Sequence, residues 1–323
     1  MRIGVAPAAL VAVVLAIGAA LALSHLSGTR VRPNAPTGSR TVKPSASPTS
    51  TPTARPASEP HVLVIMEENQ GYDATLGNCS ADPYICSLAS TYASVSPWSG
   101  VSHPSLPNYL GVTSGSTQGC SSDSCGSYSA DNLGNQLSVA GIPWIGYMES
   151  MPSACYTGSS YDEYAGKHNP FVHYTDILTG GSCASHVLPY LNANSLVSTL
   201  DGANAPDFVW ITPNLINDMH DGTVQDGNAW LLANLAPVLT SPWFTDFNST
   251  VLVTMDESTS DNSGSGGGHI PTIVISSNAK GKGRVSITGN QYGTLRSIEG
   301  AYGLPLLGAA ASAANGDLRG LFG

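Results

Sequence analysis

Residues 62–69 read VLVIMEEN, and this stretch decides the fold class. Five consecutive apolar residues, Val62–Met66, are typical of a strand that is buried on both faces. Similar short apolar runs lie at Trp144–Met148, Phe208–Thr212, Thr250–Met255 and Thr272–Ser276. The helices expected between them are Leu133–Val139, Val224–Ala236 closed by Pro237, and Gln291–Tyr302 closed by Gly303 and Pro305. Strands that alternate with helices predict an α/β domain with a mainly parallel sheet, covered by helices on both faces.

Polar residues follow three of the expected strands. Glu67–Asn69 come after the first strand, and a loop with Asp218, His220 and Asp221 comes after Thr212. Asp256 and Glu257 come after Met255. Because ligands bind at the carboxyl ends of the strands in open α/β sheets, we expect these groups to converge.

The converging residues have the composition of a divalent metal site, because carboxylate and amide oxygens suit hard cations and imidazole adds a zinc-like position. Any one acidic pair, taken alone, is more simply interpreted as a solvated loop end. The presence of all the pairs together favours a site. The residues expected to hold the metal are Glu68, Asn69, Asp218, Asp256, Glu257 and His269, and the metal could be magnesium, calcium, manganese or zinc.

The segment His103–Tyr109 leads into a short expected helix. Ser105, near the start of that helix, would face backbone N–H donors and the positive end of the helix dipole, which suits an anion. A serine hydroxyl bound to a metal is a usable nucleophile. Ser105 as a simple helix N-cap is an equally good interpretation.

Charge restricts the partners of the domain. Residues 61–323 contain 6 Lys and Arg and 21 Asp and Glu, which gives a balance of −15. Such a surface repels nucleic acid and anionic lipid, so no nucleic-acid partner is expected. A phosphate substrate would need a local positive centre, and a bound metal would supply one.

Several enzyme classes lack their main motif in this sequence. There is no G-x-S-x-G, G-x-x-x-x-G-K-[ST], H-E-x-x-H or G-x-G-x-x-G. These absences argue against an α/β-hydrolase, a P-loop enzyme, a zincin and a dinucleotide enzyme.

The N-terminal part indicates export. Residues 1–23 are predicted to be a signal peptide or an N-terminal anchor, and a membrane is expected as a partner only if this segment is not cleaved. Residues 24–60 are predicted to be a disordered stalk, since 17 of the 28 residues in 33–60 are Pro, Ser or Thr. Residues 61–323 form the expected catalytic domain, which would be secreted or held at the cell surface.

All six cysteines follow the stalk, and an even number in an exported chain favours three disulfides. Six cysteines allow 15 connectivities. Short local loops favour Cys79–Cys86, Cys120–Cys125 and Cys155–Cys183.

Four ordered motifs together resemble the phosphoesterase family, which holds bacterial phospholipases C and acid phosphatases. They cover about residues 60–306 and are Val64–Asn69, His103–Tyr109, Pro213–Gly222 and Thr254–Glu257. Lys167-His168-x-Pro and Tyr302–Pro305 support the acid phosphatase branch. Gln70–Asp73 stand where phospholipases C have Arg-Ser-Phe-Asp, which also favours a phosphatase.

The resemblance implies an alkaline-phosphatase-like α/β/α sandwich. It implies that Ser105 is a nucleophile that becomes phosphorylated, with His103, His168 and His220 binding phosphate or transferring protons. It implies that Glu68 and Asn69 are the first metal or phosphate ligands and that Asp256 and Glu257 are the paired ligands after the late strand. His269 occupies a place where the phospholipase branch has a histidine that the phosphatase branch need not keep. We also expect Asn69, Asn108 and Lys167 to bind the substrate.

The function expected from the sequence is an exported phosphomonoester hydrolase that acts on a small-molecule or lipid phosphate ester. A phospholipase C-type phosphodiesterase is the nearest alternative. An inert surface-binding protein on the same fold is an alternative of another class.

Overall fold

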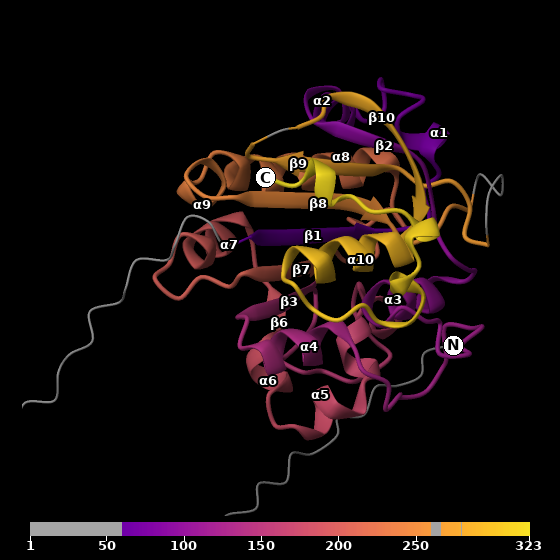
Figure 1. Ribbon diagram of the computed structural model, residues 1–323, viewed down its shortest axis with the longest axis vertical. Coiled ribbons are helices and arrows are strands. Elements are labelled where there is room, and N and C mark those ends of the chain that lie inside the picture. Colours follow the sequence, from indigo (N-terminus) through magenta and orange to yellow (C-terminus); the bar gives the residue numbers. More distant parts are fainter. Residues whose placement is uncertain (1–59, 260–265, 279) are drawn as a thin grey trace, which may run out of the picture. The chain divides into compact units, whose positions relative to one another are not determined.

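Eight strands form one sheet in the order β10-β2-β9-β8-β1-β7-β3-β6 (Figure 1). Their bounds are β1 His61–Glu67, β2 Ala93–Ser99, β3 Trp144–Glu149, β6 Val187–Tyr190, β7 Phe208–Thr212, β8 Ser249–Met255, β9 Thr272–Ser276 and β10 Gly283–Asn290. Strand β9 is antiparallel to both of its neighbours, and the other pairs are parallel. The computed structural model describes residues 60–259, 266–278 and 280–323, which lie in one unit, Thr51–Gly323. It confirms the predicted α/β class and the mainly parallel sheet.

Helices pack on the sheet in two groups. Helices α3, α4 and α10 lie together on one face, with α10 in yellow in front of the sheet in Figure 1, and α2, α7, α8 and α9 pack together on the other face. The α-helices are α1 Tyr72–Thr75, α2 Pro83–Thr91, α3 Ser105–Ser114, α4 Leu133–Ala140, α5 Thr175–Thr179, α6 Cys183–His186, α7 Ala193–Leu200, α8 Val224–Leu239, α9 Pro242–Thr245 and α10 Gln291–Ala301. The short elements are the hairpin β4 Ser160–Tyr161 and β5 Tyr164–Ala165, and the 3-10 turns η1 Gly166–His168, η2 Pro170–His173, η3 Gly308–Ala311, η4 Ala313–Asn315 and η5 Arg319–Leu321.

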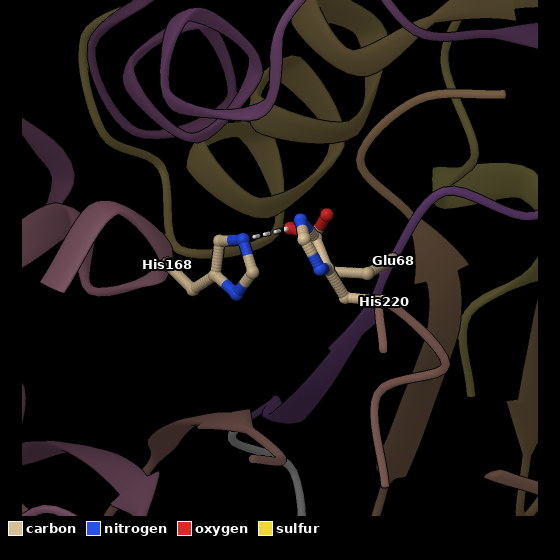
Figure 2. Close-up of side chains that lie close together, drawn as sticks. All are labelled: Glu68, His168 and His220. Carbon is tan, nitrogen blue, oxygen red and sulfur yellow. Dashed lines mark ion pairs between the residues drawn. The ribbon is translucent and has the colours of Figure 1, made fainter. Parts of the chain in front are cut away.

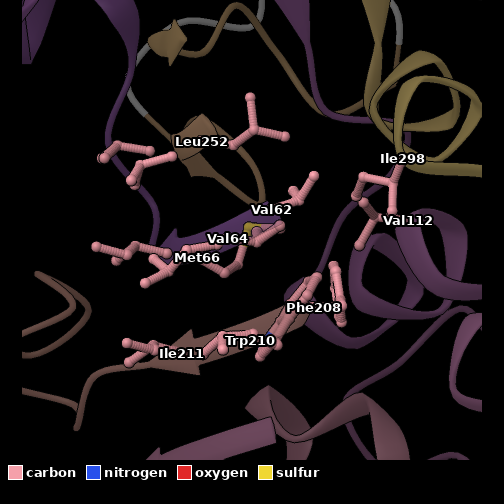
Figure 3. Packing of buried hydrophobic residues seen from close by; sticks show 14 of the residues in the cluster. Val62, Val64, Met66, Val112, Phe208, Trp210, Ile211, Leu252 and Ile298 are labelled. Atoms are coloured by element: carbon pink, nitrogen blue, oxygen red, sulfur yellow. The ribbon is translucent and has the colours of Figure 1, made fainter. Parts of the chain in front are cut away.

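The core forms around β1, because all seven of its residues are buried. Figure 3 shows Val62 of β1 close to Val112 of α3 and Ile298 of α10, the helices that cover this face. Each such side chain stabilises the fold by about 1.5–3 kcal/mol when it is removed from water. This packing fixes the direction of β1 and therefore the place where its last residues emerge.

Three strands of the sheet were missing from the sequence prediction: β2, β6 and β10. Strand β2 contains serines and Pro97, and the edge strand β10 alternates between exposed and half-buried residues. Neither has the continuous apolar run used to find the other strands. Edge strands commonly carry polar residues, because one side of the strand faces solvent.

The prediction that Pro237 ends the helix begun at Val224 was wrong, because α8 continues to Leu239. Pro237 cannot donate to the carbonyl of Ala233, so the helix loses one backbone hydrogen bond, but only Val238 and Leu239 follow it before the helix ends. Leu235 and Val238 are buried in the hydrophobic core and hold this last turn in place. The helix begins with a capping box between Thr223 and Asp226, which satisfies two backbone donors.

The three disulfides are Cys79–Cys86, Cys120–Cys125 and Cys155–Cys183, as predicted, and the described residues contain no free cysteine. None of the described helices has the length and apolar character needed to cross a membrane. The predicted signal or anchor at 1–23 and the stalk at 24–60, apart from Pro60, lie outside the described residues.

Glu299 of α10 is a buried carboxyl group remote in sequence from the candidate site residues. One oxygen accepts a hydrogen bond from the backbone N–H of Leu307 at 2.9 Å, and the other oxygen is buried without a donor among the described residues. Burial raises the pKa of Glu299 to about 8. The folded protein therefore holds this proton more tightly than the unfolded chain does.

We expect Glu299→Gln to flatten the pH dependence of stability. The contribution of Glu299 is fully present below the unfolded-state pKa of about 4.3 and is lost as the pH rises through about 8, because the charged form is disfavoured in the fold. Thermal unfolding between pH 5 and pH 9 should show that the stability of the variant, relative to that of the wild type, increases as the pH rises. The exposed Glu163→Gln is the matched control. Parallel curves for wild type and Glu299→Gln would contradict the expectation.

Candidate functional site

The polar residues predicted to converge do lie at one edge of the sheet. Strands β1, β2, β7 and β8 run in the same direction, so their carboxyl ends meet at that edge. The backbone ties these ends together, since Glu68 N donates to Asp218 O at 2.8 Å and Asp256 N donates to Glu67 O at 3.0 Å. Four carboxyl groups become almost completely buried there, those of Glu68, Asp218, Asp256 and Glu257.

Ser105 is the first residue of α3 and lies between two of these carboxylates. Its hydroxyl is 3.0 Å from Glu68 Oε2 and 3.3 Å from Glu257 Oε1, and the residue is only 2% exposed. Pro104, and not Ser105, is the N-cap of the helix. The Ser105 hydroxyl is therefore directed at the acidic cluster and does not cap its own helix.

Asn108 holds the loop that carries His103 and Ser105. Its Oδ1 accepts hydrogen bonds from the backbone N–H groups of Val101 and Ser102, and its Nδ2 donates to the carbonyls of Ser102 and Pro104. The carboxamide is thus fully engaged within the loop. In the fold, Asn108 stabilises the loop through these hydrogen bonds. Substrate binding by Asn108 stays a prediction.

His168 connects two carboxyl groups. Its Nε2 is 3.1 Å from Glu68 Oε1 and its Nδ1 is 3.2 Å from Asp218 Oδ2. The ring stacks on Tyr109, and Thr212 Oγ1 donates to the His168 carbonyl at 3.1 Å, which anchors the residue to the end of β7. Burial, together with the nearby Lys167 and His220, lowers the pKa of His168 well below its usual value.

Glu68, His168 and His220 form a candidate metal-ligand cluster (Figure 2). One ligand atom from each residue lies within 4.8 Å of the other two. The only other such group among the described residues contains Cys79 and Cys86, whose sulfurs are joined in a disulfide. Two imidazoles with one carboxylate suit a zinc-like ion, whereas the oxygens around Ser105 suit a harder cation.

The buried carboxyl groups at this edge of the sheet disfavour one another's negative charge. Burial raises the pKa of Glu68 and of Asp218 well above the usual range, and burial with the neighbouring Glu257 raises the pKa of Asp256 to about 7. Asp256 Oδ2 is buried and receives no hydrogen bond from any described residue. Carboxylates packed this closely need protons or a cation between them, and the donor set fits a divalent cation.

His103 and Lys167 are two further predicted residues, and their side chains are more exposed than the carboxylates. His103 Nδ1 contacts Glu257 Oε2, and 40% of the His103 side chain is exposed. His220 has Nδ1 2.7 Å from Asp221 Oδ1 and Nε2 3.0 Å from Lys167 Nζ. These positions place all three predicted catalytic histidines, and Lys167, around the carboxylates.

Asn69 and His269, which were also predicted as metal ligands, lie outside the group formed by Glu68, His168 and His220. The backbone of Asn69 has a φ of +60°, which asparagine tolerates, and this turn lets its N–H donate to Asp256 Oδ1 at 3.1 Å. His269 has its ring stacked on Tyr72 and its Nε2 3.2 Å from Ser96 Oγ. The structure thus does not place His269 in the candidate metal-ligand cluster. A ligand role for either side chain stays a prediction.

Sequence reasoning missed Asp123, which contacts Lys167 and the start of α3, and gave no role to Tyr109. Asp123 lies in the loop closed by Cys120–Cys125, and no motif marks it. A cleft of about 800 Å³ opens beside Lys167 and His220. This disulfide loop and the hairpin β4–β5 with its flanking residues line the cleft, mostly with glycine and hydroxyl residues.

Comparison with known proteins identifies the family and several similar phosphatases. The model of the phosphoesterase family matches residues 81–305. The phosphatidylinositol-3-phosphatase of Mycobacterium tuberculosis is 33% identical over 78% of this chain and 80% of its own length. An acid phosphatase of Aspergillus fumigatus is 28% identical over 75% of this chain, which spans about half the length of that fungal relative (54%).

Solved structures share the fold at low sequence identity. Murine ectonucleotide pyrophosphatase/phosphodiesterase 5 matches with a TM-score of 0.56 and 11% identity, over 82% of this chain and 100% of its own. A protein of the alkaline phosphatase superfamily from Vibrio parahaemolyticus matches with a TM-score of 0.55 and 12% identity, over 78% of this chain and 69% of its own. These matches confirm the alkaline-phosphatase-like architecture that the motifs implied.

Proposed function

The chain belongs to the phosphoesterase family and is a phosphoric ester hydrolase, and from this premise we propose that it is an exported phosphomonoesterase with Ser105 as its nucleophile. One observation carries the proposal: the buried Ser105 hydroxyl lies between Glu68 Oε2 and Glu257 Oε1 at the start of a helix. Buried carboxylates can orient the hydroxyl and accept its proton, and the helix start favours the phosphate anion.

Glu68, Asp256 and Glu257 would hold a divalent cation, with Asp218, His168 and His220 close enough in the same group to add a second position. A cation bound there neutralises the carboxylates, attracts the phosphate oxygens and favours ionisation of the serine hydroxyl. Magnesium, calcium, manganese and zinc all suit parts of this donor set.

The protein residues perform the proton transfers and the positioning. Ser105 Oγ attacks phosphorus in line, the bond to the leaving alcohol breaks, and the phosphoryl group is held on Ser105. His103 protonates the leaving oxygen, since Glu257 orients its Nδ1 and its Nε2 has no hydrogen bond to a described residue. The same histidine then removes a proton from the water that hydrolyses the phosphoserine.

His168 acts by positioning. It is buried, and both ring nitrogens face carboxyl groups, so it fixes Glu68 relative to Asp218 and does not exchange protons with solvent. Lys167, which lines the cleft, and Asn69 are the residues that we expect to contact the phosphate.

A substrate panel tests the function. We expect p-nitrophenyl phosphate to be hydrolysed and bis(p-nitrophenyl) phosphate to be hydrolysed at least about a hundredfold more slowly, because a diester carries one negative charge less and a second ester arm. A phosphatidylinositol 3-phosphate belongs in the panel because a relative is named for that activity. Preference for the diester would favour the phospholipase C alternative, and no turnover of any ester would favour the inert binding protein.

A further inference from the structure

Asp123 links the start of α3, which carries Ser105, to Lys167. Its Oδ1 accepts a hydrogen bond from the backbone N–H of Leu106 at 3.1 Å, and its Oδ2 accepts one from Lys167 Nζ at 2.9 Å. Leu106 directly follows Ser105 in α3. One carboxylate therefore bridges the helix start and the lysine that lines the cleft.

Within the described ranges, few other donors lie at this place. Residues 104 and 107 are prolines, so the backbone N–H groups at the start of α3 that have no partner within the helix belong to Ser105 and Leu106. Among the described Lys and Arg side chains, Lys167 is the one with contacts in this group of residues, namely Asp123 and His220. These are the donors that we expect a phosphoryl group attacked by Ser105 to meet.

We propose that Asp123 is a specificity-determining residue that occupies the phosphate position in the free enzyme and is displaced by the substrate. This inference rests on the proposed function. It adds that a carboxylate of the protein competes with the substrate phosphate for the same donors. The carboxylate reproduces two oxygens and one negative charge of a phosphate, and it spans Leu106 N and Lys167 Nζ as a bound phosphate would.

A phosphate could replace Asp123 in its contact with Lys167. The side chains of Asp123 and Lys167 are 30% and 21% exposed, so solvent reaches the ion pair and its net stabilisation is small. The loop of Asp123 is closed by Cys120–Cys125, which keeps the carboxylate at the cleft when it swings away. A phosphate monoester with nearly two negative charges competes well for the same donors, whereas a singly charged diester competes less well.

The test compares Asp123→Asn with wild type for inorganic phosphate binding and for turnover of p-nitrophenyl phosphate. We expect the dissociation constant of phosphate, measured by isothermal titration calorimetry, to fall about tenfold, and KM to fall by a similar factor, because one charge-assisted hydrogen bond no longer has to be broken. Asp162→Asn is the control, since it removes one charge from the exposed hairpin that lines the same cleft. It should leave both constants unchanged.

Lys167→Met should weaken phosphate binding, and the gain from Asp123→Asn should shrink when both changes are combined. Unchanged or weaker phosphate binding by Asp123→Asn would show that Asp123 only holds Lys167 or its loop, and the proposal would be wrong. If the asparagine variant does not fold, Asp123→Ser gives the same comparison. Phosphate binding is read without turnover, so a wild type that binds phosphate but hydrolyses no monoester would overturn the proposed function alone.

Discussion

Ser105→Ala is expected to lower kcat by about a thousandfold or more, because the covalent step loses its attacking oxygen. The fold should persist, since the change removes one hydroxyl whose hydrogen bond to Glu68 contributes about 1 kcal/mol. Steady-state turnover and thermal unfolding of the same sample measure the two effects. Acid quenching of the wild type during turnover, followed by peptide mass analysis, should find a phosphoryl group on Ser105.

Ser114→Ala is the matched control for this change. Ser114 lies at the other end of α3, is buried, and donates a hydrogen bond to Leu110 O at 2.8 Å. It tests the cost of removing a buried hydroxyl from the same helix without touching the carboxylates, and it should retain near wild-type turnover. If Ser105→Ala keeps more than a few per cent of kcat, Ser105 is not the nucleophile.

The second large effect is expected from Asp256→Asn. Asp256 is fully buried, and its Oδ2 lacks a hydrogen bond from the described residues, so it has an oxygen available for a cation. Loss of one charged ligand should weaken divalent-cation binding by about 10–100-fold and lower turnover in parallel, with partial recovery at high cation concentration. Metal analysis and activity should be measured on the same purified protein before chelation, after chelation and after each cation is restored.

The exposed Asp246→Asn removes the same charge at a distance from the cluster in sequence and should change neither quantity. A chelated, metal-free wild type with an undiminished rate would contradict the metal-assisted mechanism. Activation of Ser105 would then fall to a histidine, either His103 through Glu257 or His168 through Glu68.

The candidate site was partly predictable because of a geometric rule. Glu68, Asp218 and Asp256 each follow a strand, and the carboxyl ends of parallel strands meet at one edge, so sequence position alone places them together. Ser105 also comes soon after the carboxyl end of a strand, β2, although that strand was not predicted from the sequence. His269 reaches the same edge in another way, since it precedes the antiparallel strand β9 and pairs with Ser99 at the end of β2, and its ring stacks on Tyr72 there.

The sequence by itself determined the strands that are apolar throughout, the disulfide pairs that close short loops, and the acids that lie at the ends of strands. Those features depend on neighbours along the chain: a run of apolar residues must be buried, and sequence separations of 7 and 5 residues keep two of the cysteine pairs close. Only the tertiary structure decided which of the remaining polar groups meet. His168 reaches Glu68, and Asp123 reaches Leu106 and Lys167, through segments inserted between the elements of the sheet. Their positions depend on packing between distant segments, such as the anchoring of His168 by Thr212, and no local pattern in the sequence encodes such a contact.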